Sequence, residues 1–307
     1  MAIARGTARL LLDELRERPF SGSVLQLGRM LVCVSEAELS EWASEQGVPL
    51  RALESWGLSH HPDLARQGCL DDKTFFRALG FDEVVACDIS DQEGAEILLD
   101  LNQPVPEKLH GSFDVVFEAG TIQHVFHLPN VFRNIHALLK PGGRVIHGMS
   151  PSHNHVDHGF YMFSPTLFHD YYSANAYRIE ASYVFEYRPA WYRNRLLSRP
   201  WKIYRYAPGA LDHLSYGGFS DEQLGIFFVA TKTEAATDDV IPQQSAFGAG
   251  RMFHDIESSG RGDRSPDLGE RLMRRRWLSD FFVRGKTLRN WAWRKFLRRK
   301  PPLHARY

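Results

Sequence analysis

The chain has 307 residues, 43% of them hydrophobic and 24% charged, and its 37 basic side chains balance its 37 acidic ones. A chain of this length can bury a full α/β core with residues left over. No segment approaches the about 20 apolar residues of a membrane-spanning helix, which excludes an integral helical membrane protein. The N-terminal residues lack the apolar run of a signal peptide, so we expect a soluble, cytoplasmic protein.

The net charge of zero results from two oppositely charged parts of the chain. Residues 251–307 hold 16 Lys and Arg against 6 Asp and Glu, whereas residues 1–250 hold 21 against 31. The sequence therefore predicts an acidic globular body followed by a basic C-terminal segment.

Helices and strands alternate through the first half of the chain. Ser35 and Glu38 form a capping-box pattern that predicts a helix start, and Gly80 is a helix stop signal. In chain order we expect a helix at 7–18, a strand at 23–28, helices at 36–46 and 71–79, a strand at 82–90 and a short apolar piece at 95–102.

The alternation continues in the second half. The run at 112–120 is apolar on both faces, which is typical of a parallel strand covered by helices. We expect that strand to be followed by an amphipathic helix at 130–143 and by strands at 143–152, 177–187 and 224–233. The order predicts an α/β fold with an open, mostly parallel sheet and helices on both faces.

Composition divides the chain into three parts. Residues 1–233 are the predicted α/β domain, with an insertion at 188–219 in which aromatic residues alternate with Arg and Lys. That insertion either contacts a planar or sugar-like acceptor or forms a helical cap that packs on the sheet. Residues 234–269 are rich in Gly, Ser, Asp and Pro, and we expect a disordered linker there.

Residues 270–307 form the basic tail. From residue 271 onward it holds 13 Lys and Arg against Asp280 alone, with aromatic residues interspersed. Such a pattern is typical of an amphipathic helix on an anionic membrane surface, and we expect a protein peripheral to the membrane. Docking on the acidic body is the second interpretation, and nucleic-acid binding is the third.

Polar residues follow the predicted strands at the points where each one ends. Gly28 ends the first strand and Asp88 the second, and the EAG run Glu118, Ala119 and Gly120 ends the strand at 112–120. Ligands of doubly wound sheets bind outside the carboxyl ends of the strands. A carboxylate at the position of Asp88 can accept both hydrogen bonds of a ribose diol, or it can merely cap the next turn.

These segments together resemble class I S-adenosylmethionine-dependent methyltransferases over about residues 20–232. The resemblance is carried by VLQLG, VVACDIS, DLNQPVPEKLHGSFDVVFEAGTIQHV and LKPGGRVI. The chain also looks like a bacterial subgroup with LGR at the end of the first strand and an HGFYxFSPxLF segment, here HGFYMFSPTLF at 158–168. The implied fold is Rossmann-like, and the implied cofactor is S-adenosylmethionine.

The resemblance also implies roles for single residues. Gly28 would approach the methionyl part of the cofactor, and Asp88 would hold the ribose. Asp100 and Leu101 would flank the adenine, and Glu118, Ala119 and Gly120 would line the floor near the sulfonium.

Arg29 stands where the family's GxGxG loop has a small residue. It would pair with the cofactor carboxylate or, alternatively, form a salt bridge within the acidic body. The insertion at 47–70 separates the first two strands and could form a lid over the site.

Several histidines follow the later strands. His124 and His158 are the predicted proton acceptors for a substrate hydroxyl or amine, because the imidazole pKa lies near neutral pH. The spacing of His153, His155 and His158 is also compatible with a metal, although it matches no established ligand pattern, and we predict no metal site.

The sequence thus predicts an S-adenosylmethionine-dependent methyltransferase acting on an O or N atom of a small-molecule or glycan-like acceptor. Two alternatives stay open. One is a non-catalytic binding or scaffold protein whose cofactor site is closed by Arg29 and Met30. The other is a metal-dependent hydrolase or isomerase that uses the loop at 153–158.

Overall fold

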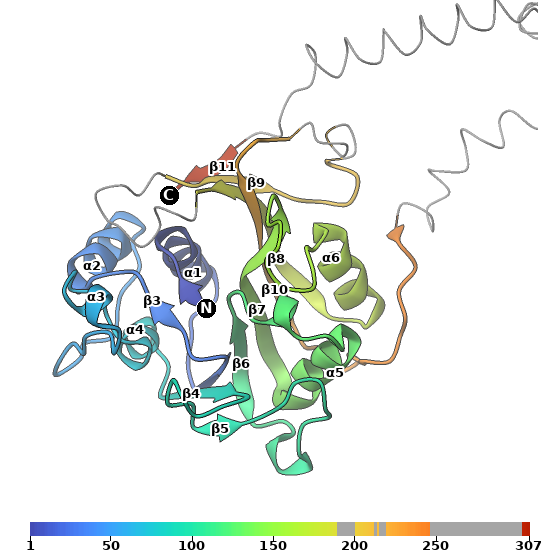
Figure 1. Ribbon diagram of the computed structural model, residues 1–307, viewed down its shortest axis with the longest axis horizontal. Helices are drawn as coiled ribbons and strands as arrows, with labels where there is room; N and C mark the ends of the chain where they lie inside the picture. The colour runs from blue at the N-terminus through green and yellow to red at the C-terminus, as the bar shows by residue number, and fades with distance from the viewer. Residues whose placement is uncertain (189–199, 212–213, 215–218, 246–302) are drawn as a thin grey trace, which may run out of the picture. The chain divides into compact units, whose positions relative to one another are not determined.

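Figure 1 shows the chain as a computed structural model, in which residues 1–188, 200–211, 214, 219–245 and 303–307 are described. The chain divides into two units, of which the first comprises residues 1–206, 221–242 and 303–307. This first unit is the α/β body and contains every helix and strand discussed below. Most of the second unit, residues 207–220 and 243–302, lies outside the described residues.

The helices begin and end close to the predicted signals. The capping box of Ser35 and Glu38 is present, and the Asp71 side chain accepts a hydrogen bond from the amide of Thr74. Gly80 ends its helix with φ +120°. The helices are α1 (Arg5–Glu17), α2 (Glu36–Glu45), α3 (Pro62–Ala65), α4 (Asp72–Leu79), α5 (Leu128–Leu138) and α6 (Pro165–Ala174), with two 3-10 turns, η1 (Glu107–Leu109) and η2 (Ile122–His124).

Nine strands form one sheet in the order β11-β9-β8-β10-β7-β6-β2-β4-β5. In chain order they are β2 (Ser23–Leu27), β4 (Glu83–Asp88), β5 (Ile97–Leu98), β6 (Phe113–Glu118), β7 (Leu139–His153), β8 (Arg178–Tyr187), β9 (Lys202–Arg205), β10 (Gln223–Thr231) and β11 (Leu303–Arg306). A separate parallel pair joins β1 (Ala2–Ile3) to β3 (Leu31–Val32).

The sheet is parallel where the predicted site lies. Strand β2 pairs in parallel with both β4 and β6, and β6 pairs in parallel with β7. Strand β10 then runs antiparallel between β7 and β8. The strand order reverses direction at β2, so the carboxyl ends of β2, β4 and β6 meet at one edge of the sheet.

Helices cover both faces of the sheet. Helices α1, α2 and α4 lie on one face, and α5 and α6 lie on the other (Figure 1). The side chains of β2 alternate accordingly, because Val24 belongs to the first core and Leu25 to the second. The predicted α/β fold with a mostly parallel sheet and helices on both faces is confirmed.

Three local expectations need correction. No residue of the insertion at 47–70 lines the large cavity described below, so the lid is not seen. Residues 139–143, predicted as the end of a helix, belong to β7. The insertion at 188–219 contributes the strand β9 where a helical cap was one interpretation, although its Trp201 does pack on the sheet as that interpretation expects, with its ring centroid 4.2 Å from that of Phe185.

The predicted linker and tail are partly described. Residues of the linker lie against α6, since the Asn175 carbonyl accepts from Thr237 N (3.0 Å) and its side chain accepts from Val240 N (3.0 Å). Residues 303–306 form the edge strand β11 instead of a helix. The expected disorder and the amphipathic membrane helix otherwise fall on residues 246–302, outside the described part of the chain, and stay predictions. Within the described residues, no helix has the length and apolarity that crossing a bilayer requires.

Gly6 in α1 provides a test of this packing. A Cβ at residue 6 would overlap the Trp201 ring. Gly6→Ala, which would stabilise an isolated helix, should therefore destabilise the protein by about 1–3 kcal/mol in urea unfolding. Ser44→Ala on the exposed face of α2 is the control and should change stability by less than about 0.5 kcal/mol. A Gly6→Ala protein as stable as the wild type would contradict the packing of Trp201.

Candidate functional site

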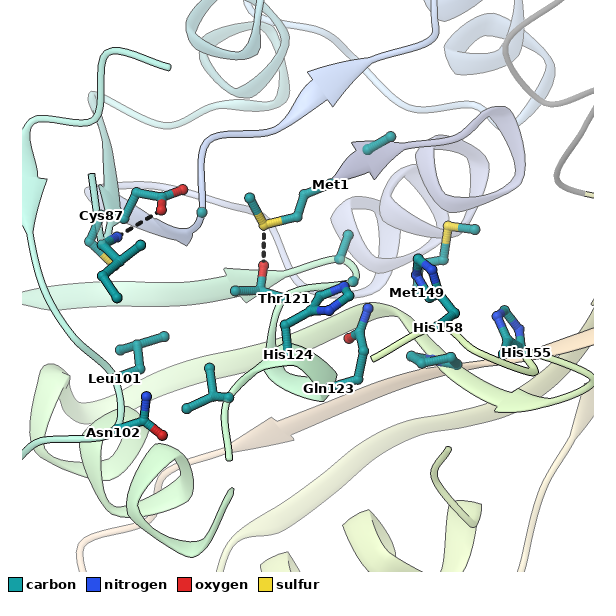
Figure 2. A pocket seen from close by; sticks show the side chains of 18 of the residues that line it. Met1, Cys87, Leu101, Asn102, Thr121, Gln123, His124, Met149, His155 and His158 are labelled. Carbon is teal, nitrogen blue, oxygen red and sulfur yellow. Dashed lines mark hydrogen bonds between the residues drawn. The ribbon is translucent and has the colours of Figure 1, made fainter. Parts of the chain in front are cut away.

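A cavity of about 720 Å³ lies at the edge of the sheet where the strand order reverses. Gly28 follows β2, Asp88 ends β4, and residues 119–121 follow β6, and all of them line the cavity. Figure 2 shows Leu101 and Asn102 on one side, Met1 and Thr121 in the middle, and His124, His158 and His155 on the other side. The sheet therefore brings together residues that are far apart in the sequence, at the position that the strand pattern predicts.

One end of the cavity carries carboxylates and apolar surface. Asp88 accepts a hydrogen bond from the amide of Ile89 (2.7 Å) through one oxygen, and a carboxylate has further acceptor sites. Asp100 accepts from both the backbone and the side chain of Asn102, and these hydrogen bonds lower the pKa of Asp100. Leu101 is 7% exposed and supplies an apolar wall. We define these residues as the carboxylate end of the cavity.

The middle of the cavity is narrowed by Met1. Gly28 has φ +78°, and a Cβ there would overlap the Met1 thioether. The Thr121 hydroxyl lies 2.7 Å from the Met1 sulfur and also contacts the Leu27 carbonyl. The Met1 side chain thus packs beside Gly28, in the space where the resemblance would place the methionyl part of a cofactor.

Arg29 does not line the cavity. Its guanidinium pairs with Asp72 (3.2 Å), which is fully buried, and donates to the Glu93 carbonyl (2.8 Å). Met30 is fully buried in the core. The geometry favours the alternative of a salt bridge within the body for Arg29, because its donors already have protein partners.

Glu118 also lies outside the cavity wall, directly beneath it. Its fully buried carboxylate accepts from His147 Nδ1 (2.8 Å) and Ser150 Oγ (2.7 Å) on β7. The other oxygen accepts from the amides of Gly120 (3.1 Å) and Thr121 (3.3 Å), which do line the cavity. Glu118 therefore fixes the turn that forms the floor, whereas Ala119 and Gly120 supply the surface of that floor.

Burial alone would raise the pKa of Glu118, but the hydrogen bonds from His147 and Ser150 and the nearby His147 ring hold it below its usual value. On the far side of His147, Nε2 lies 2.8 Å from the Tyr172 hydroxyl. Burial raises the pKa of Tyr172 well above its usual value, so this hydroxyl keeps its proton beside the ring.

The other end of the cavity is formed by Gln123, His124, His155 and His158, and we call it the acceptor end. The ring centroids of His124 and His158 are 5.1 Å apart, and those of His155 and His158 are 6.1 Å apart. Burial, together with the neighbouring His158, lowers the pKa of both His124 and His155. These two rings are therefore neutral at pH 7 and can accept a proton.

The loop at 153–158 is the candidate metal site considered from the sequence. In the described ranges of the chain, no group of three or more His, Cys, Asp or Glu side chains is arranged to hold a metal ion. His155 instead lies 3.1 Å from the Leu224 carbonyl and 3.2 Å from the Tyr187 hydroxyl, and His153 does not line the cavity.

Sequence reasoning missed Met1, Thr121, Gln123 and the buried pair of His147 and Tyr172. Thr121 and Gln123 lie in the quoted EAGTIQHV run, so their position after β6 was the available signal. Nothing in the sequence pattern places Met1 near Gly28, because that contact depends on the pairing of β1 with β3.

Glu118→Gln tests the buried network. At pH 7 the variant should be less stable than the wild type by about 1–3 kcal/mol, because it leaves buried partners unsatisfied. The lowered pKa of Glu118 stabilises the fold above the unfolded-state value of 4.5, and this contribution is lost as the pH falls through the folded-state pKa. The difference in free energy of unfolding between the wild type and the variant, measured with denaturant, should therefore shrink below about pH 4.5. Glu107→Gln, on the exposed η1, is the control. A difference that widens in acid would contradict this assignment.

The acceptor end makes a second prediction, accessible to histidine NMR titration. His124 should titrate below 6.5, and His158→Asn should raise its pKa by removing a competing positive charge. His153→Asn, at an exposed position outside the cavity, should leave the His124 titration unchanged. If His124 titrates at 6.5 or above in the wild type, the partial desolvation of its ring and the influence of His158 are contradicted.

Comparison with known proteins gives a family match within the α/β body. Residues 68–147, from before α4 into β7, match a family model described as a methyltransferase domain. No curated protein matches the sequence.

Solved structures with similar folds include three methyltransferases. A 1,6-didemethyltoxoflavin N1-methyltransferase from Burkholderia thailandensis, solved with S-adenosylhomocysteine, is 13% identical with a TM-score of 0.35, over 75% of this chain and 78% of that one. Phosphoethanolamine N-methyltransferase 2 from Haemonchus contortus, solved with S-adenosylmethionine, is 17% identical with a TM-score of 0.36, over 74% of this chain and 52% of that one. An S-adenosylmethionine-dependent methyltransferase from Archaeoglobus fulgidus is 13% identical with a TM-score of 0.36, over 74% of this chain and 96% of that one.

The family match covers the strands that carry Asp88 and the floor of the cavity. The bacterial subgroup stays a prediction. The strand order confirms the predicted Rossmann-like fold, and the family match assigns similarity to a methyltransferase domain over residues 68–147.

Proposed function

We propose that the protein transfers a methyl group from S-adenosylmethionine to a nitrogen or oxygen atom of a small-molecule or glycan-like acceptor. The observation that carries this proposal is the convergence of Gly28, Asp88 and Gly120 on one cavity at the carboxyl ends of β2, β4 and β6. Such a position at the reversal of strand order is where doubly wound sheets bind nucleotide-like ligands.

The carboxylate end suits the nucleoside part of the cofactor. Asp88 would accept the hydrogen bonds of the ribose diol, since only one of its oxygens is used by the Ile89 amide. Leu101 would pack against the adenine, and Asp100 would hold the turn beside it through Asn102. Gly28 and Gly120 would allow close approach of the backbone, because both have positive φ.

The acceptor end suits the second substrate. S-adenosylmethionine supplies a methyl group on a sulfonium that is already a good leaving group. The chain's own contribution is to align the acceptor, exclude water and take up one proton. We propose His124 and His158 as the proton acceptors, because both rings line the cavity and a low pKa keeps His124 neutral.

The Met1 side chain favours the alternative of a binding protein on the same fold. It occupies space beside Gly28 that a bound cofactor would need. The backbone of Ala2 and Ile3 is paired with β3, so the Met1 side chain can be displaced without unfolding that pair. Cofactor binding therefore separates the two proposals.

The test is a calorimetric titration of the purified protein with S-adenosylmethionine and S-adenosylhomocysteine. We expect micromolar binding, and Asp88→Asn should weaken it by at least about tenfold through loss of the charged ribose contact. Asp91→Asn is the matched control, because Asp91 is exposed in the same loop but does not line the cavity.

Two results would contradict the proposal. A folded wild-type protein that binds neither compound would favour the binding-protein alternative. Binding that is equally weakened by Asp91→Asn would show that Asp88 has no specific role.

A further inference from the structure

A buried polar atom at the acceptor end lacks a partner. The side chain of Gln123 is buried, and in the described part of the chain its Oε1 has no hydrogen-bond partner. Leaving such a buried oxygen unpaired lowers the stability of the protein. Because Gln123 lines the cavity beside His124, a bound molecule with an N–H or O–H donor would satisfy this oxygen.

The backbone around Gln123 is held by the segment that follows β7. Phe160 N donates to the Gln123 carbonyl (2.8 Å), and the Tyr161 hydroxyl donates to the Phe126 carbonyl (2.6 Å). Gly159 has φ +79°, and a Cβ there would lie 2.7 Å from Gln123 Cγ. The conformation of this segment therefore fixes the Gln123 backbone and limits the space around its side chain.

The charged side chains that line the cavity disfavour anionic acceptors. No Lys or Arg is found among its lining residues in the ranges that the structure describes, whereas Asp88, Asp100 and Asp157 are. His124 and His155 are neutral at pH 7, because burial lowers the pKa of each. A phosphate or carboxylate at this end would have the Met1 ammonium as a nearby cation, since that ammonium contributes to the lowered pKa of His124, but no Lys or Arg side chain among the described lining residues to offset its desolvation.

Apolar side chains lie beside the acceptor end. Val156 lines the cavity and is 86% exposed, and Phe126 directly follows the lining residue Val125. Phe126 and Phe160 are both more than half exposed, with ring centroids 5.6 Å apart in an edge-to-face arrangement. Exposed apolar groups next to a cavity are typical of a ligand-binding surface, and we call the pair of Phe126 and Phe160 together with the lining residue Val156 the apolar rim.

We propose that the methyl acceptor is an aryl- or alkylamine, with its nitrogen directed to Gln123 Oε1 and its apolar body on the apolar rim. This inference rests on the proposed methyltransferase function. The nitrogen lone pair would form the new N–CH₃ bond as the S–CH₃ bond breaks, and S-adenosylhomocysteine would leave with the sulfur electron pair. The proton lost from nitrogen would pass to the neutral His124 and then to solvent.

The experiment compares ligands that differ in one feature. The full chain is first titrated with S-adenosylhomocysteine, and the saturated protein is then titrated by calorimetry with phenethylamine, 3-phenylpropionate or ethanolamine. Phenethylamine should bind at least about tenfold more tightly than 3-phenylpropionate, which carries a carboxylate in place of the amine. Ethanolamine, which lacks an apolar body, should also bind at least about tenfold more weakly.

Two variants locate the binding site. Gln123→Leu should weaken phenethylamine binding by about tenfold through loss of the acceptor oxygen. Phe126→Ala should also weaken phenethylamine binding by about tenfold, because it removes apolar contact with the ligand. Phe126 is exposed, so this variant still tests the proposal if the variant at the buried Gln123 does not fold. Leu58→Ala is the matched control, since Leu58 is 55% exposed and does not line the cavity.

The results separate the two proposals. Failure of the first titration would contradict the methyltransferase site itself. Binding of S-adenosylhomocysteine followed by no phenethylamine binding, by equal binding of 3-phenylpropionate, or by no effect of either variant would overturn the amine proposal alone.

Discussion

The geometry of the cavity floor depends on one buried carboxylate. Glu118 ends β6, accepts hydrogen bonds from His147 and Ser150 on β7, and accepts two more from the amides of Gly120 and Thr121. One side chain thus links two central strands to the turn that faces the ligand. Burial makes this charge costly, and the four surrounding donors offset that cost. Without them, the carboxylate would take up a proton or the site would unfold.

The two ends of the cavity differ in chemistry because they come from different parts of the fold. The carboxylate end lies over the parallel strands β4 and β5, where the chain makes short connections. The acceptor end is formed by η2 and by the segment after β7, which hydrogen bonds hold together between Phe160 and Gln123. A ligand that spans the cavity therefore passes from the carboxylates at the sheet edge to the histidines and Gln123. Two of these histidines belong to a loop in which Asn154 and Asp157 both have positive φ.

The fold could be predicted largely from local signals. The capping box at Ser35, the Gly80 stop and the run at 112–120 each correspond to an observed element, because each depends on nearby residues. The positions of Asp88 and Gly120 followed from the strand order. The position of the Arg29 side chain could not be predicted. Its ion pair with Asp72 joins residues that are far apart in the sequence, and no periodic pattern in the sequence indicates such a pair. The same holds for Trp201, whose contact with Phe185 depends on the pairing of β8 with β9.

The edge strand β11 has a consequence for how the chain folds. Leu303 pairs with Tyr204, and Tyr307 exchanges backbone hydrogen bonds with Trp201 while its ring lies beneath Arg9 of α1, 4.8 Å from the guanidinium carbon. During synthesis the rest of the sheet can form before residue 303 leaves the ribosome, but β9 then presents an unpaired edge. Closing this edge joins segments far apart in the chain and costs loop-closure entropy, so its formation is a late step in folding. In the nascent protein, β9 therefore presents an edge that is open to pairing with another chain.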